Sequence, residues 1–364
     1  MPPEGKTPSM KEKLFQLAVS NMVSNAINVG NRLNLFKKLA EISNEKNPVL
    51  PEQLAEAAGC KERYVREWCN CMACGEIIEV NGEERFWIKE EDVEVLASGG
   101  NEVTMNGIVA PLLEPLDQLI ECFKKDGPLG LEYTQFSKFQ SVMSEMTKGL
   151  QVENLVSDMV KALGNGIYEK LESGNARVLD VGCGTGFHLS LLAEHYPNTT
   201  FVGLDIGSDA LEMARARKKK SGESFENLDF VKCDASSMPT NWEESFDLVL
   251  QFDSCHDMCR PDLCVQEVHR VLKHSGTYAM IEIIGSSNVH TDKATMGPSA
   301  AFLYGISLFH CLPVGSNHPT AFCLGSMWGQ KRAMDLLNKH GFPEVKTVAT
   351  PYFPVNVIYC AQKE

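Results

Sequence analysis

The stretch Val178-Leu179-Asp180-Val181-Gly182-Cys183-Gly184-Thr185-Gly186 decides how the second half of this chain folds. Its first four residues have the mainly apolar character of a buried β-strand, and the next five form a glycine-rich turn. Glycine has no Cβ and tolerates positive φ, so such a turn lets the backbone approach a ligand closely. We therefore predict a ligand-binding loop between a strand and a helix.

From Arg177 onward, extended apolar runs alternate with helical patterns. The predicted strands cover 177–181, 200–205, 228–233, 246–252 and 277–284, and the predicted helices lie near 186–196, 208–220 and 262–273. Strands that alternate with helices are typical of βαβ units, so the sequence predicts an α/β fold with a parallel sheet.

The glycine loop alone does not identify its ligand. A dinucleotide-binding fingerprint carries a third glycine in the following helix, whereas Phe187 occupies that position here. Asp205 ends the second predicted strand about 20 residues after the loop, where a carboxylate can accept both hydroxyls of a ribose. Phe187 weakens the dinucleotide interpretation, and Asp205 favours a ribose-bearing ligand of either kind.

Two further aspartates complete an ordered series of motifs. Asp234 follows the third predicted strand, and Asp247 opens the fourth. The series D-V-G-C-G-T-G, G-L-D, C-D-A and F-D-L-V resembles that of the class I S-adenosylmethionine-dependent methyltransferases. The resemblance implies a Rossmann-like, seven-stranded domain that binds S-adenosyl-L-methionine and releases S-adenosyl-L-homocysteine.

The resemblance also implies how this cofactor is held. The loop glycines would pack against its methionine and ribose portions, Asp205 would bind the ribose diol, and Asp234 would bind the adenine amino group beside Ala235. Asp180 would contact the methionine ammonium directly or through water, whereas Asp247 is interpreted as ordering a turn. The implied cofactor-binding residues are Asp180, Gly182, Cys183, Gly184, Gly186, Asp205, Ile206, Asp234, Ala235, Phe252 and Tyr133.

A candidate general base follows the fourth predicted strand, in Asp253-Ser254-Cys255-His256-Asp257. Histidine has an ordinary pKa near 6.5, so it can accept a proton at neutral pH. The segment resembles the His-Asp element of small-molecule O-methyltransferases, which implies that His256 is the base. Asp253 and Asp257 are the candidate residues that orient it, and a purely structural histidine remains the alternative.

The first hundred residues predict a mainly helical winged-helix domain, 1–100. Apolar spacing from Lys11 to about Ala40 predicts two helices, with a break or a tight helix contact in the polar, glycine-containing stretch 28–34. Residues 51–73 have the outline of a helix-turn-helix, and 76–88 form a predicted hairpin with an Asn-Gly turn.

Winged helices often bind DNA, and Lys61, Arg63 and Arg66 lie on the second helix of the predicted motif. The formal net charge of −14 opposes binding to a polyanion. We therefore expect a scaffold that forms a homodimer, and no nucleic-acid partner. A DNA-binding regulator with a ligand-sensing methyltransferase fold is the alternative from another functional class.

The remaining segments are assigned by their position. Residues 101–163 are expected to form a helical linker and lid in which Tyr133 and Phe136 close over the cofactor or pack in the core. Residues 164–364 form the predicted methyltransferase domain. Its insertion 286–327 is expected to line the acceptor pocket, with the candidate residues His290, Tyr304, His310, Cys311 and His318, and Trp328 just beyond.

No metal site is predicted. The chain has 13 cysteines, and four of them cluster upstream without the distant second pair that zinc sites usually have; these are Cys60, Cys69, Cys71 and Cys74. The histidines and the cysteine of the insertion are also irregularly spaced. A polar N-terminus and the lack of a run near ~18 apolar residues predict a cytoplasmic protein without a membrane partner.

The full-length pattern resembles a bacterial and nematode group of winged-helix methyltransferases, whose nematode branch acts on small thiols. The acceptor implied by this resemblance is therefore a small thiol. Methylation of a hydroxyl group on a small metabolite is the alternative, because no single residue selects sulfur over oxygen.

Overall fold

The computed structural model describes residues 8–364 except 137, 165 and 351–354. The chain divides into two compact units, Met1–Pro111 and Leu112–Glu364, which we describe separately. The division falls inside the predicted linker 101–163, whose first residues belong to the helical unit.

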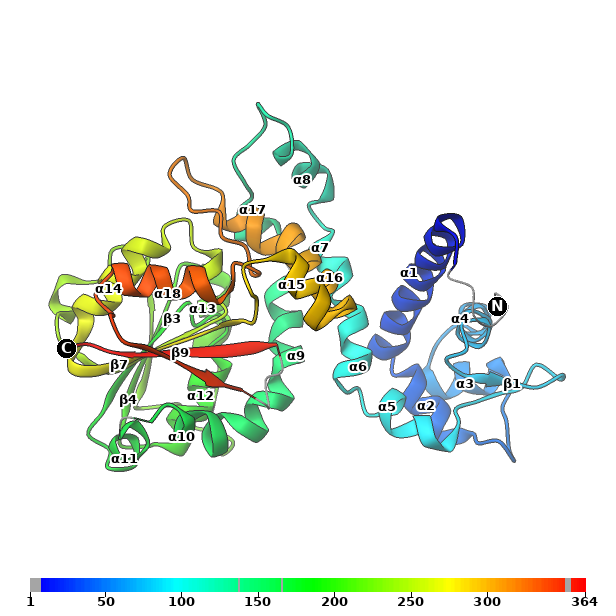
Figure 1. Ribbon diagram of the computed structural model, residues 1–364. Helices are drawn as coiled ribbons and strands as arrows, with labels where there is room; N and C mark the ends of the chain where they lie inside the picture. Colours follow the sequence, from blue (N-terminus) through cyan, green and yellow to red (C-terminus); the bar gives the residue numbers. More distant parts are fainter. Residues whose placement is uncertain (1–7, 137, 165, 351–354) are drawn as a thin grey trace. The chain divides into compact units, whose positions relative to one another are not determined.

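The first unit is built from helices around one apolar core (Figure 1). Helix α1 begins after a capping box between Ser9 and Glu12, which satisfies free backbone N–H groups at the helix start. Helix α3 begins with a proline and ends at Gly59, which has a φ of +64°. The helices are α1 (Met10–Arg32), α2 (Leu35–Ile42), α3 (Pro51–Ala58), α4 (Glu62–Cys74), α5 (Val93–Ala97), α6 (Asn101–Thr104) and α7 (Val109–Leu112).

The polar stretch 28–34 contains both of the predicted features, at different residues. The chain turns at Asn34, which has a φ of +55°. Gly30 remains helical and lies against the α4 tryptophan, where a Cβ on Gly30 would come within 2.6 Å of the Trp68 ring. The glycine is therefore required by close packing between α1 and α4.

The predicted hairpin is present but shorter than expected. Strands β1 (Glu79–Val80) and β2 (Phe86–Trp87) pair antiparallel, and Val49 adds a bridge to Phe86. The Asn81 side chain accepts hydrogen bonds from the backbone of Glu83 and Arg85. The turn is consequently wider than a two-residue Asn-Gly turn.

The second unit contains a seven-stranded sheet with the order β5-β4-β3-β6-β7-β9-β8. Five neighbouring strands run parallel, and β9 is antiparallel to both of its neighbours. The strands are β3 (Arg177–Val181), β4 (Thr200–Asp205), β5 (Leu228–Lys232), β6 (Phe246–Phe252), β7 (Leu272–Ile283), β8 (Val345–Ala349) and β9 (Asn356–Gln362). The predicted Rossmann-like fold is confirmed.

Helices cover both faces of this sheet (Figure 1). Apolar residues of α10, α11, α12 and α13 pack on one face, and those of α14 and α18 pack on the other. Their bounds are α10 (Val160–Ala162), α11 (Ile167–Glu172), α12 (Phe187–His195), α13 (Ser208–Arg215), α14 (Pro261–Val271) and α18 (Gly329–Lys339). Covering both faces explains why the central strands are almost entirely apolar.

Two helical segments flank the carboxyl ends of the strands. One comes before the sheet and contains α8 (Leu116–Cys122), a 3-10 turn at Tyr133–Gln135, α9 (Phe139–Asn154) and a π-helical turn at Leu155–Met159. The other is the insertion after β7, with α15 (Val289–Met296), α16 (Pro298–Ile306), a π-helical turn at Ser307–Cys311 and α17 (Leu312–Gly315).

The insertion corrects one expectation. Within the described residues, Pro298–Gly315 is long and apolar enough to cross a membrane by length and composition, although no such run was expected. It is 44% buried within the structure. Core helices of globular domains share both properties, so this stretch is weak evidence for a membrane span.

Candidate functional site

The predicted site residues come together at one edge of the sheet. Strands β4, β3, β6 and β7 are consecutive neighbours and run parallel, so their carboxyl ends lie side by side. In open α/β sheets this edge forms the ligand crevice. It carries the glycine loop after β3, Asp205 at the end of β4 and the His256 segment after β6.

The glycine loop is held tightly on one side and open on the other. A Cβ on Gly182 would come within 2.5 Å of the Ser254 hydroxyl, and a Cβ on Gly186 would come equally close to the Phe230 ring. At Gly184, which has a φ of +52°, a Cβ would meet nothing within 4 Å. The loop therefore has an unfilled space beside Gly184, as a cradle for a ligand requires.

Asp205 fixes the loop and keeps capacity for a ligand. Its two carboxylate oxygens accept the backbone N–H groups of Gly184 at 2.8 Å and Gly207 at 2.7 Å. Each oxygen has a further lone pair that can accept a ribose hydroxyl. Burial raises the pKa of Asp205, although these backbone hydrogen bonds oppose the shift.

Asp180 is completely buried at the base of the loop. Its Oδ2 contacts the His188 ring at 2.6 Å, whereas its Oδ1 has no hydrogen-bond partner among the described residues. A buried carboxylate oxygen without a donor is energetically costly. An ammonium group or a water molecule would satisfy it, so the geometry fits the methionine end of the implied cofactor.

The other expected cofactor residues differ in their surroundings. Ile206 is 56% exposed and Asp234 is exposed, while Ala235 is buried beside it. The Phe252 ring packs against the His188 ring with centroids 4.5 Å apart. Cys183 is buried in the core under the sheet, so only its backbone belongs to the loop. Its side chain packs in that core.

His256 is almost completely buried and is oriented by Glu282 on β7. The Nδ1 atom of His256 lies 2.5 Å from Oε2 of Glu282, and the other Glu282 oxygen accepts the backbone N–H groups of Cys255 and His256. The Trp328 indole also donates to Glu282. This arrangement fixes the imidazole ring and leaves Nε2 facing away from Glu282.

Charges around His256 make it a stronger base than an ordinary histidine. Burial alone would lower the pKa of His256, but the carboxylates of Glu282 and Asp257 raise it well above 6.5. They stabilise the protonated imidazole, which is the form that exists after proton transfer.

The two aspartates expected to orient His256 have different roles. Oδ1 of Asp257 lies 3.4 Å from Nε2 of His256, and Oδ2 accepts a hydrogen bond from the Tyr133 hydroxyl at 2.9 Å. Asp253 instead accepts from the Asn356 side chain at 2.7 Å, so its expected hydrogen bond to His256 is replaced. Burial raises the pKa of Asp253 to about 7.

The insertion contributes only part of its predicted pocket residues to this site. Cys311 is buried within hydrogen-bonding reach of His256 and Asp257, and burial raises the pKa of its thiol to about 12. The His310 ring stacks on Phe139 with centroids 3.7 Å apart. His290 and His318 are exposed, and Tyr304 donates to Asp292.

Glu282 is the functional residue that the sequence interpretation missed. It interrupts the apolar run Met280-Ile281-Glu282-Ile283 and is fully buried. A carboxylate within a buried strand is rare unless it is paired. A glutamate inside an apolar strand was therefore the signal in the sequence. Its partner could not be identified from the sequence, because the contact depends on how close the loop after β6 lies to β7.

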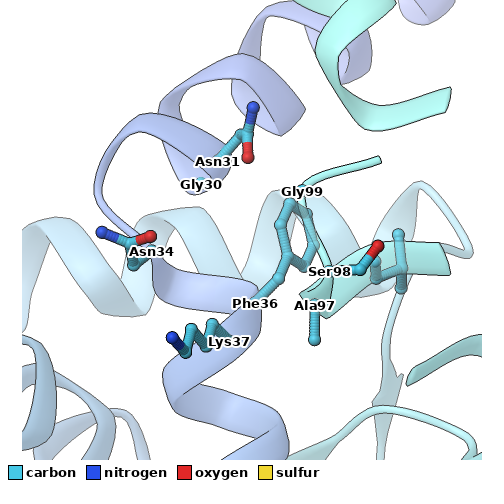
Figure 2. Close-up of a pocket in the computed structure, with 9 residues that line it drawn as sticks. Gly30, Asn31, Asn34, Phe36, Lys37, Ala97, Ser98 and Gly99 are labelled. Atoms are coloured by element: carbon cyan, nitrogen blue, oxygen red, sulfur yellow. The ribbon is translucent and has the colours of Figure 1, made fainter. Parts of the chain in front are cut away.

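The helical unit has a separate hollow beside α1 and α2 (Figure 2). Figure 2 shows Phe36 between α2 and the Ala97–Gly99 segment. The polar side chains that line this hollow include the amides of Asn31 and Asn34, and the Lys37 side chain is exposed. The hollow contains none of the predicted site residues.

Two families match parts of this chain. Residues 172–334 match the family described as a methyltransferase domain, and residues 21–97 match the Rv2258c-like winged HTH domain. A fatty-acid O-methyltransferase from Mycolicibacterium smegmatis is 39% identical over 102 residues, which cover 28% of this chain and 35% of the relative. The match thus spans about a third of that relative.

Solved structures resemble the whole chain in fold. A protein from Nostoc punctiforme assigned as an O-methyltransferase has a TM-score of 0.69 at 17% identity, covering 98% of this chain and 100% of that chain. Human N-acetylserotonin methyltransferase, solved in complex with S-adenosylmethionine, has a TM-score of 0.61 at 17% identity and covers 99% of both chains. These likenesses establish the fold.

The Glu282 contact predicts a change in the titration of His256. In Glu282→Gln the pKa of His256 should be lower than in the native chain, because one stabilising carboxylate is gone. NMR titration of the histidine ring protons measures it. The folded-state pKa of His256 is raised above its unfolded value, so protonated His256 stabilises the native chain. This stabilisation is fully present below about pH 6.5 and is lost as the pH rises through the raised pKa.

The matched control for this titration is Glu344→Gln, which neutralises an exposed glutamate. The control should leave the His256 titration unchanged. An unchanged His256 pKa in Glu282→Gln would contradict the assigned contact.

Proposed function

We propose that this chain, which combines a winged-helix domain with an S-adenosylmethionine-dependent class I methyltransferase domain, transfers a methyl group to a hydroxyl group of a small molecule. The observation that carries the proposal is the buried contact between His256 and Glu282 beside the glycine loop. A histidine held by a carboxylate can act as a general base when its other nitrogen is within reach of the acceptor, and a hydroxyl acceptor needs such a base.

The residues at the loop fit the methyl donor. The space beside Gly184, the carboxylate of Asp205 and the Asp180 Oδ1, which has no partner among the described residues, would hold its ribose and methionine portions. The donor supplies an electrophilic methyl group on a sulfonium. The chain itself aligns the acceptor, excludes water and removes a proton, which are the requirements of an in-line displacement.

Proton removal is assigned to Nε2 of His256. Glu282 holds the opposite nitrogen, Nδ1, and so fixes both the ring orientation and the tautomer. Asp257 and Glu282 stabilise the imidazolium formed when the acceptor loses its proton. Tyr133 holds Asp257 in place through its hydroxyl, which makes Tyr133 a positioning residue at this end of the pocket.

This assignment favours oxygen over the sulfur acceptor expected from the sequence. A thiol has an ordinary pKa near 8.5 and already supplies some thiolate at neutral pH, whereas most hydroxyl groups remain protonated. Similar proteins also include O-methyltransferases, among them the fatty-acid enzyme. The thiol expectation has no support from these comparisons, and O-methylation agrees better with them.

The charges on the winged-helix motif support a small-molecule enzyme over a DNA-binding regulator. Arg66 is paired with Glu62 and Glu52 at 2.6 Å, and Arg63 is paired with Glu67 at the same distance. These acids offset the positive charge that phosphate binding requires. A salt-dependent gel shift with duplex DNA would overturn this part of the proposal.

The proposal predicts that donor binding and turnover separate by mutation. Asp205→Ala should weaken S-adenosylhomocysteine binding by about 10- to 100-fold, the range expected for losing hydrogen bonds to a charged group. His256→Asn should keep that affinity and lower kcat by about 10²- to 10⁴-fold. Isothermal calorimetry and a coupled assay measure the two effects. Equal donor affinity in Asp205→Ala would contradict the site assignment.

The acceptor class is predicted to show in the pH dependence of the reaction. A panel of phenols, alcohols, thiols and carboxylic acids should give S-adenosylhomocysteine mainly with hydroxyl compounds. The rate should rise with pH through the raised pKa of His256, because only the neutral ring accepts a proton. Glu282→Gln should move this rise to lower pH. Turnover with thiols alone would refute O-methylation.

A homodimer through the helical unit is a further part of the proposal. Helix α1 exposes large apolar side chains along its length, namely Met10, Leu14, Phe15, Leu17 and Met22. Sedimentation equilibrium should give twice the chain mass, and Phe15→Glu combined with Leu14→Glu should give a monomer. A monomeric native protein would contradict the dimer.

We also propose a cytoplasmic location, which cell fractionation tests.

A further inference from the structure

The acceptor side of the site contains a compact set of metal-ligating groups from two separate segments. His256 and Asp257 follow β6, and Cys311 ends the π-helical turn of the insertion. One ligand atom of each lies within 4.8 Å of the others. We propose that Nε2 of His256, the Asp257 carboxylate and Sγ of Cys311 form a binding site for Zn²⁺.

The orientation of His256 is suited to metal binding. A histidine ligand usually binds the metal through one ring nitrogen while its other nitrogen contacts a carboxylate. Glu282 contacts Nδ1 at 2.5 Å, and Nε2 faces Asp257 and Cys311. Glu282 therefore occupies the supporting position found behind histidine ligands.

The distance between the histidine and carboxylate ligand atoms matches that of a tetrahedral zinc site, and the sulfur lies within 4.8 Å of both residues' ligand atoms. With zinc bonds of about 2.0–2.1 Å to nitrogen and oxygen, two ligand atoms are separated by roughly 3.3–3.4 Å. Nε2 of His256 and Oδ1 of Asp257 are 3.4 Å apart, which is longer than an ordinary hydrogen bond. A nitrogen, oxygen and sulfur ligand set is one that zinc accepts, and three protein ligands leave the fourth position open.

Two unpartnered groups point to a missing ligand at this place. Oδ1 of Asp257 has no hydrogen-bond partner among the described residues, and the Asp257 side chain is only 9% exposed. The His310 ring is 1% exposed, and neither of its nitrogens has such a partner in the same part of the chain. Its Nδ1 lies 3.7 Å from the other Asp257 oxygen. A bound cation with a water ligand would satisfy both groups.

The local charge is also unbalanced. Glu282 is fully buried and Asp257 is nearly so; His256 lies between the two carboxylates, and His310 lies near Asp257. Burying carboxylates without equal positive charge is costly. Zn²⁺ would replace the imidazolium proton of His256 and the thiol proton of Cys311, so the net charge would stay the same while a divalent cation stands beside the carboxylates.

The proposal has a consequence that rests on the proposed function. The lone pair on Nε2 of His256 either binds zinc or accepts a proton from the acceptor. Zinc occupancy and methyl transfer therefore exclude each other, and Zn²⁺ should inhibit the reaction at concentrations that match its dissociation constant. Zinc binding itself does not depend on the identity of the reaction.

The test is a metal titration of the untagged, full-length, reduced protein, with Co²⁺ as a spectroscopic probe and Zn²⁺ measured by competition with a chromophoric chelator. One Co²⁺ per chain should bind and produce a thiolate-to-cobalt charge-transfer band that Zn²⁺ removes. Cys311→Ser should abolish the band. Asp257→Asn should lower Zn²⁺ affinity by more than about 100-fold, and Glu282→Gln by about 10- to 100-fold, as expected for a supporting residue.

The matched controls are Cys323→Ser and His318→Ala, which change exposed residues of the same segment of the chain. Both should bind metal as the native protein does. Circular dichroism establishes that each variant is folded. The cobalt band of the native protein tests the site without any substitution. No stoichiometric metal binding, or an unchanged band in Cys311→Ser, would overturn the site.

A methyl-transfer assay on the same preparation separates this proposal from the proposed function. The turnover is measured on metal-free protein, because bound Zn²⁺ is itself expected to inhibit; metal binding by a protein whose metal-free form turns over no acceptor would leave the zinc site and remove the enzymatic proposal. Turnover without metal binding would do the reverse. Zinc binding that leaves turnover unchanged would overturn the role of Nε2 as a shared ligand and base.

Discussion

The carboxylate of Glu282 is the interaction on which the candidate site depends. It accepts hydrogen bonds from the backbone of Cys255 and His256 and from the Trp328 indole, and it contacts the His256 ring. These donors come from the loop after β6 and from the start of α18. One buried side chain thus joins the sheet, the loop that carries His256 and the end of the insertion. A neutral residue of similar size would form weaker hydrogen bonds to the same donors.

The same carboxylate creates an electrostatic problem that explains the surroundings of the site. Glu282 and Asp257 are both removed from water, and they stabilise positive charge at His256. A base made strong in this way stays protonated to higher pH, which suits an acceptor that also loses its proton at higher pH. The same carboxylates favour either a proton or a metal ion at Nε2, so the proposed base and the proposed zinc site depend on the same nitrogen lone pair.

The sheet brings these groups together at one edge. The carboxyl ends of β3, β4, β6 and β7 are adjacent because the strands are parallel neighbours. Asp205 links two of these ends by accepting the backbone N–H of Gly184. The glycine loop and the proposed base are therefore fixed by the same hydrogen-bonded sheet, and α15 to α17 form the proposed acceptor side.

The sequence by itself determined the local features: the strand and glycine turn at 178–186, the aspartate ending β4, and the histidine after β6. Each of these features follows from a pattern within one short segment: an apolar run predicts the strand, the glycines predict the turn, and the two side chains are located by their position at or after a strand. The sequence patterns did not predict strands β8 and β9, the start of β7 at Leu272 or the end of α13 at Arg215. Tertiary packing overrides weak local patterns at such places. Only the tertiary structure decided that Glu282 orients His256, that Asp253 contacts Asn356, and that Cys311 reaches the site, because those contacts join segments far apart in the chain.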